Sequence, residues 1–74
     1  MVTKIRLTTP NELSEFVHLA ALSDYDIGVY ASDTERADGK SIVGLLALEF
    51  DRPLLVVTED EHFLKKIHKW SLDA

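Results

Sequence analysis

The chain has 74 residues, of which 46% are hydrophobic and 28% charged, with no cysteine and a formal net charge of −5. This length accommodates one small domain, residues 1–74, and the apolar content is typical of a folded protein rather than a disordered one. The lack of cysteine excludes disulfides and thiolate metal sites. The acidic balance argues against nucleic-acid binding, which requires a basic surface.

No segment of the sequence resembles a membrane anchor or a secretory signal. The longest apolar stretch, Ile42 to Leu48, contains Gly44 and is far shorter than the roughly 20 residues that a membrane-spanning helix needs. The first residues also lack the uninterrupted apolar segment of a signal peptide. We therefore expect a soluble, cytoplasmic protein with no membrane partner.

The first half of the chain predicts a strand, a helix and a second strand. Alternation over Val2–Thr8 favours a half-buried strand. The sequence Thr9-Pro10-Asn11-Glu12 has the capping-box pattern with proline at the first helical position, so we expect a helix running to about Leu22. Its apolar stripe comprises Leu13, Phe16, Val17 and Ala20. A strand follows at Ile27–Ala31, and Glu35–Ala37 is either a short edge strand or a loop.

The second half predicts two helices separated by a buried strand. Ser41 is the expected N-cap of a short helix over Ile42–Glu49, and Leu54–Val57 is the strand. Thr58–Glu61 repeats the capping-box pattern before a last helix, whose apolar stripe comprises Phe63, Leu64, Ile67 and Trp70. The order β-α-β-β-α-β-α, in so short a chain, predicts an α+β open-faced sandwich with helices on one face of a mostly antiparallel sheet.

The predicted helix over Ile42–Glu49 is apolar almost all the way round. If Ile42, Leu45 and Leu48 point inward, Val43 and Leu46 must point outward. Two explanations are open. The exposed side chains form a contact surface for a partner, or the last helix or a dimer partner covers them.

The titratable residues do not indicate an enzyme or a metal site. No two of His18, His62 and His68 have the i, i+4 spacing of a helical metal site, so we expect each at the surface. The carboxylates lie mostly where helix caps and turns need them, and no two stand apart as an acid–base pair. We predict no catalytic residue, metal or other cofactor.

The segment Lys40-Ser41-Ile42-Val43-Gly44-Leu45-Leu46-Ala47-Leu48 resembles the regulatory-serine helix of HPr, the histidine-containing phosphocarrier protein of the bacterial sugar phosphotransferase system. The segments Phe16–Ala20 and Asp24–Ile27, and the order of the elements, also resemble that family. The resemblance implies the HPr fold and places Ser41 at a regulatory phosphorylation site. It also implies protein partners, namely phosphotransferase-system enzymes or a serine kinase. The residues expected to contact them are Lys40, Ile42, Val43 and Leu46.

The chain departs from that family at the start of its first helix. HPr carries its phosphoryl group there on a histidine that is closely followed by arginine and proline. Here residues Leu7–Leu13 contain neither histidine nor arginine, Glu12 adds a negative charge, and His18 lies about two turns inside the helix. We therefore expect an HPr-like regulatory protein-binding module that does not carry phosphohistidine. The alternative is an active phosphocarrier that uses Thr8, Thr9 or His18.

Overall fold

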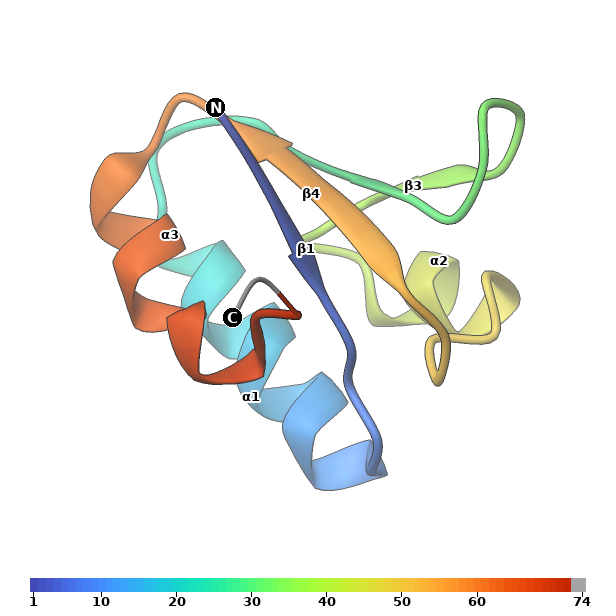
Figure 1. Ribbon diagram of the computed structural model, residues 1–74. Helices are drawn as coiled ribbons and strands as arrows, with labels where there is room; N and C mark the ends of the chain where they lie inside the picture. Colours follow the sequence, from blue (N-terminus) through green and yellow to red (C-terminus); the bar gives the residue numbers. More distant parts are fainter. Residues whose placement is uncertain (73–74) are drawn as a thin grey trace.

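A layer of helices covers one face of an antiparallel sheet (Figure 1). The computed structural model describes residues 1–72 of the chain. Within this part, the elements are β1 (Val2–Ile5), α1 (Pro10–Ala21), β2 (Ile27–Tyr30), β3 (Arg36–Asp38), α2 (Ile42–Ala47), β4 (Leu54–Thr58), α3 (Glu61–Lys66) and a 3₁₀ turn (His68–Trp70). The predicted α+β open-faced sandwich is confirmed. No helix in residues 1–72 is long and apolar enough to cross a membrane.

The sheet has the strand order β1-β4-β2-β3, and every neighbouring pair is antiparallel. The register places Val29 opposite Val56 in the two central strands, and both side chains are completely buried. Side chains alternate between the two faces along a strand, so their neighbours in sequence point to the opposite face. One face of the sheet therefore supports the core, whereas no helix of the described residues covers the other face (Figure 1).

The helices bury their predicted apolar stripes against the sheet. On α1, Leu13, Phe16 and Ala20 are buried, and Thr9 caps the helix by accepting a hydrogen bond from the Glu12 amide. The aromatic ring of Phe16 meets the rings of two residues from the end of the chain, Phe63 and Trp70. Sequence spacing alone thus predicted which side of α1 faces the core.

The start of α3 differs from the prediction. Thr58 does not cap this helix, because it belongs to β4 and pairs with Ile27 across the sheet. Its buried hydroxyl donates to the Asp26 carbonyl, and Asp60 caps α3 instead by accepting from the Phe63 amide at 3.0 Å. The capping-box interpretation of residues 58–61 was wrong because sheet pairing holds Thr58 in the strand.

Both ends of the chain also differ from the predicted boundaries. The first strand ends at Ile5 rather than at Thr8, and the last helix divides at Ile67 into α3 and the 3₁₀ turn. The turn allows the chain to come back alongside β1, where the Leu72 amide donates to the Lys4 carbonyl at 2.8 Å. The edge of β1 is therefore partly paired. The doubtful strand at 35–37 is present, as Arg36–Asp38.

Candidate functional site

Helix α2 begins at a side-chain cap, as the sequence predicted. Ser41 has an extended backbone, with φ −110° and ψ 107°, and its Oγ accepts a hydrogen bond from the Gly44 amide at 3.1 Å. This bond satisfies one of the amides that a helix start leaves without a partner. Ser41 is half-buried, so its hydroxyl lies at the base of the helix surface described next.

Helix α2 presents an apolar surface, formed by Ile42, Val43 and Leu46, that no other element within residues 1–72 covers. Val43 is 74% exposed and Leu46 54% exposed, whereas Leu45 is completely buried. Ile42 is 41% exposed, which agrees with its predicted place among the partner contacts rather than with an inward orientation. Ile42 occupies the first position of a six-residue helix that packs on the edge strand β3, and this contact leaves the surface exposed. The last helix does not cover this surface either, because α3 lies on the opposite side of the molecule (Figure 1).

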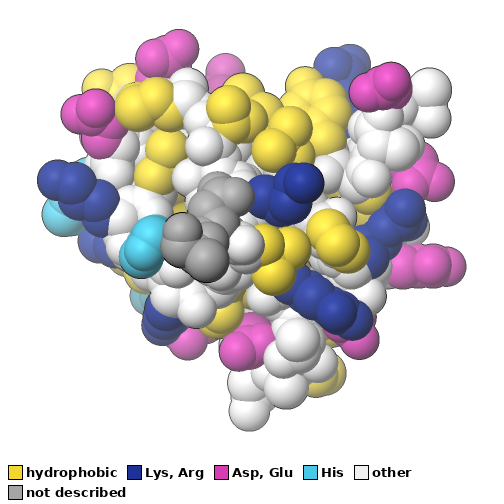
Figure 2. All heavy atoms as spheres, viewed as in Figure 1, with side chains coloured by type: hydrophobic (Ala, Val, Ile, Leu, Met, Phe, Trp, Pro, Cys, Tyr) yellow, Lys and Arg dark blue, Asp and Glu magenta, His cyan; other side chains and the backbone are white. Residues whose placement is uncertain are grey.

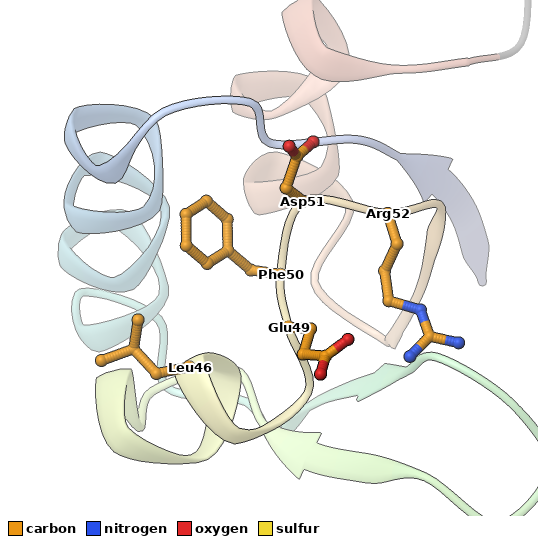
Figure 3. Close-up of a pocket in the computed structure, with 5 residues that line it drawn as sticks. All are labelled: Leu46, Glu49, Phe50, Asp51 and Arg52. Carbon is orange, nitrogen blue, oxygen red and sulfur yellow. The ribbon is translucent and has the colours of Figure 1, made fainter.

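A hollow of about 310 Å³ adjoins this apolar surface at the end of α2. Its walls are Leu46, Glu49, Phe50, Asp51 and Arg52. Figure 3 shows that Leu46 and Phe50 point toward α1, whereas Glu49 and Arg52 point to the other side. The hollow therefore has an apolar wall continuous with the α2 surface and a charged rim.

The segment that forms the hollow has one residue with a left-handed backbone and makes two ion pairs between exposed side chains. Glu49 follows the end of α2 with φ 57°, a left-handed conformation that costs a residue other than glycine about 1 kcal/mol. Asp51 pairs with Arg6, which lies just before the first helix, at 3.2 Å. Arg52 pairs with Glu35 of the β2–β3 connection at the same distance. The hollow, the α2 surface and the segment before α1 are thereby brought together.

Lys40 has a structural contact in addition to its predicted place in the partner surface. Its Nζ donates to the Ser23 carbonyl at 2.8 Å, just beyond the end of α1, and its own amide donates to the Asp38 carboxylate. The negative end of the α1 dipole also stabilises a cation at this position. Lys40 therefore connects the start of α2 with the end of α1.

The start of the first helix is occupied by the chain's own carboxylate. Glu12 Oε1 accepts hydrogen bonds from the Thr8 amide at 2.7 Å and from the Thr8 hydroxyl at 2.9 Å. These bonds, led by that from the amide, lower the pKa of Glu12 below its ordinary value of 4.5. Thr8 and Thr9 are exposed, but the hydroxyl of Thr8 points at a negative charge, which opposes the addition of a phosphoryl group there.

His18 does not approach this position. It is exposed and lies eight residues beyond Pro10, which corresponds to roughly 12 Å along the helix axis. Among residues 1–72, no group of three or more histidine, aspartate or glutamate side chains is placed to hold a metal ion. Neither of the predicted alternatives at the helix start gains a supporting group from His18.

We expect the protein to lose stability in acid because two capping carboxylates have lowered pKa values. Hydrogen bonds from the Ser23 hydroxyl and the Phe63 amide lower the pKa of Asp60 below 3.8, and Glu12 behaves similarly. Each unfolded carboxylate binds a proton more readily than the folded one. The stabilisation is therefore present above the unfolded pKa and is lost as pH falls through the folded value.

Thermal unfolding followed by circular dichroism tests this expectation. The unfolding temperature should change little down to about pH 5 and then fall. In Asp60→Asn, which keeps the shape of the cap, and in Glu12→Gln, the fall should be shallower than in the parent chain. Parallel curves for the parent and both variants would contradict the assignment.

Comparison with known proteins identifies the fold. No protein family and no curated protein matches the chain. Among solved structures, it is similar to HPr-C-His from Thermoanaerobacter tengcongensis, with a TM-score of 0.75 and 21% identity over 93% of this chain and 85% of that one. It is also similar to the phosphocarrier protein HPr from Bacillus anthracis str. Ames, with a TM-score of 0.77 and 18% identity over 96% and 95% of the two chains. The chain has the HPr fold. The resemblance noted in the sequence is thus confirmed for the architecture as a whole.

Part of the candidate site consists of residues that were not predicted from the sequence. Phe50 and Arg52, which line the hollow, follow α2 in a connection for which the sequence predicted no helix or strand. An aromatic residue between the charged residues Glu49 and Asp51 is a local sequence signal of a structured connection, and the structure half-buries Phe50. The candidate site therefore comprises the α2 surface and the hollow, with Ser41 at its base.

Proposed function

We propose that this HPr-like chain is a regulatory protein-binding module related to the phosphoenolpyruvate-dependent sugar phosphotransferase system. It acts in the cytoplasm, is not an enzyme and does not carry phosphohistidine. The observation that carries the proposal is the uncovered α2 surface, where Val43 and Leu46 stand beside the hollow on an HPr fold. Its partner is a phosphotransferase-system enzyme or a serine kinase.

The chemistry of the surface favours a protein over a small molecule. An apolar centre with a charged rim is the usual composition of a protein interface. Here Val43 and Leu46 supply the centre, and Glu49 and Arg52 the rim. The hollow can accept one apolar side chain of a partner next to Phe50. Side chains that fill such pockets usually carry most of the binding energy of an interface.

Ser41 is the proposed point of regulation. A phosphoryl group there would add about two negative charges beside Val43 and would compete for the Gly44 amide that the hydroxyl now binds. Such a charge at the base of an apolar surface disfavours an apolar partner and favours a basic one. A serine kinase would thereby switch the module between partners.

The rival proposal is an active phosphocarrier that uses Thr8 or Thr9. One observation favours it, namely the Thr8 hydroxyl lying 2.9 Å from the Glu12 carboxylate, which is the spacing of a nucleophile and a base. The same carboxylate repels an incoming phosphate, and for that reason we prefer the regulatory module.

One experiment separates the two. The chain is incubated with phosphoenolpyruvate and the first enzyme of the phosphotransferase system, with a histidine-bearing HPr as positive control. We expect no phosphoryl group on this chain by intact mass, but we expect the enzyme or a serine kinase to bind it. Val43→Ser should weaken that binding about tenfold, whereas Leu22→Ser, at the exposed C-cap of α1, should not.

Acid-labile phosphate on any histidine would overturn the proposal. Phosphate that disappears in Thr8→Val or Thr9→Val would establish the rival. Binding that is equally affected by the Val43 and Leu22 variants would remove the α2 surface as the docking site.

A further inference from the structure

The face of the sheet that carries no helices has an ordered pattern of charge. The register aligns its exposed positions in two rows that cross all four strands. The first row is Val2, Val57, Gly28 and Asp38, and the second is Lys4, Leu55, Tyr30 and Arg36. We call this surface the open face. Figure 2 shows hydrophobic side chains gathered along the upper margin of the molecule, on the side of the strands in Figure 1.

The middle of the open face is apolar and has no gap between its side chains at Gly28. Val2 is 56% exposed, while Leu55 and Val57 in the central strand are 38% and 37% exposed. The ring of Tyr30 lies over Gly28 of the same strand, where a Cβ would come within 3.3 Å of a ring carbon. The ring thus fills the space left by the glycine, so the first and second rows form one continuous apolar area.

The two ends of the open face carry opposite charge. Asp38 ends the first row, and Asp26 and Glu59 lie just beyond it, next to the paired ends of β2 and β4. Lys4 and Arg36 flank the second row, with Asp33 further out, at the rim of a hollow beyond that end. In residues 1–72, none of these side chains takes part in an ion pair.

We propose that the open face binds the open face of a second copy of this chain, across a two-fold axis that lies perpendicular to the strands. Such an axis exchanges the rows. Arg36 of each copy then meets Asp38 of the other, and Leu55 meets Val57. The pattern is complementary to itself, as the interface of a two-fold dimer must be.

The same argument excludes the other face-to-face arrangement. A two-fold axis parallel to the strands would keep each row opposite itself and reverse the order of the strands. Lys4 would then face Arg36 of the other copy, two like charges at close range, which costs association energy. The charges therefore select one orientation as well as the partner.

The size of the face predicts a weak dimer. Four strands about 4.8 Å apart, the longest of five residues, span roughly 300 Å² at most, well below the roughly 800 Å² that each partner buries in a standard interface. We expect a dissociation constant on the order of 100 µM, which rises with salt because charge pairs at the rim are screened. This inference stands independently of the proposed partner surface on α2.

Sedimentation equilibrium of the full chain tests the proposal. From about 20 µM to about 1 mM in low salt, the average mass should rise from 8.3 kDa toward twice that value. Leu55→Ser should raise the dissociation constant at least about tenfold. The matched control is Leu46→Ser, which removes an exposed leucine from the α2 surface and should leave the association unchanged.

A charge exchange supplies a result that misfolding cannot imitate. Lys4→Glu with Arg36→Glu makes both ends of the face acidic, and Asp38→Lys with Glu59→Lys makes both ends basic. Each double variant alone should remain monomeric, whereas an equal mixture of the two should associate. Circular dichroism verifies that both variants fold.

Three results would overturn the proposal. The first is a mass that stays at 8.3 kDa at the highest concentration, which would leave the open face to a different protein or to solvent. The second is an association that survives Leu55→Ser or disappears in Leu46→Ser, since another surface would then be responsible. The third is a mixture of the charge-exchanged variants that remains monomeric.

Discussion

Replacing Phe16 by alanine should lower the free energy of unfolding by about 3–5 kcal/mol, the cost of removing a buried aromatic side chain. Phe16 is completely buried on α1. Its ring lies edge-on to Phe63 of α3, with centroids 5.5 Å apart and planes at 75°, and 6.2 Å from the ring of Trp70. Truncation therefore removes the contact through which α1 holds both segments at the end of the chain.

That loss is large for a protein of this size. A chain of 74 residues has a net stability of roughly 4–11 kcal/mol, so Phe16→Ala should unfold at much lower denaturant and be partly unfolded without any. Urea unfolding followed by tryptophan fluorescence and circular dichroism measures the change. Phe16→Leu, which keeps most of the volume, serves as the control and should lose no more than about 1.5 kcal/mol. A loss below about 1 kcal/mol in Phe16→Ala would mean that the aromatic cluster does not hold the core together.

The features that the sequence predicted correctly are those that depend on near neighbours in the chain. The periodicity of Leu13, Phe16 and Ala20 identified the buried side of α1, because a helix brings residues three and four apart onto one face. Thr9 and Ser41 were recognised as caps because each bond closes on an amide three residues later. The apolar run Leu54–Val57 likewise predicted the central strand, although only Leu54 and Val56 in this run are buried.

The features that it missed depend on contacts between distant segments. Thr58 fails to cap α3 because Ile27, on another strand, pairs with it. The hollow beside α2 is lined by Asp51, which pairs with Arg6 from 45 residues away. Of the candidate site, the α2 surface was therefore predictable, but its rim was not.

Two adjacent leucines of α2 should separate folding from function in this protein. Leu45 is completely buried, and Leu45→Ala should lower the free energy of unfolding by about 2–5 kcal/mol. Leu46 is 54% exposed, and alanine favours a helix at least as well, so Leu46→Ala should change stability by less than about 0.5 kcal/mol.

Binding should follow the opposite order to stability. Leu46 forms the wall shared by the α2 surface and the hollow, so its truncation should weaken the partner complex about tenfold when measured by titration calorimetry. Leu45→Ala, tested at a temperature where it remains folded, should bind almost as tightly as the parent chain. If Leu46→Ala instead destabilises the protein as much as Leu45→Ala, the α2 surface is part of the core and cannot be where a partner docks. Because the two residues are neighbours in sequence, composition and charge are the same in both variants, and only the direction of the side chain distinguishes them.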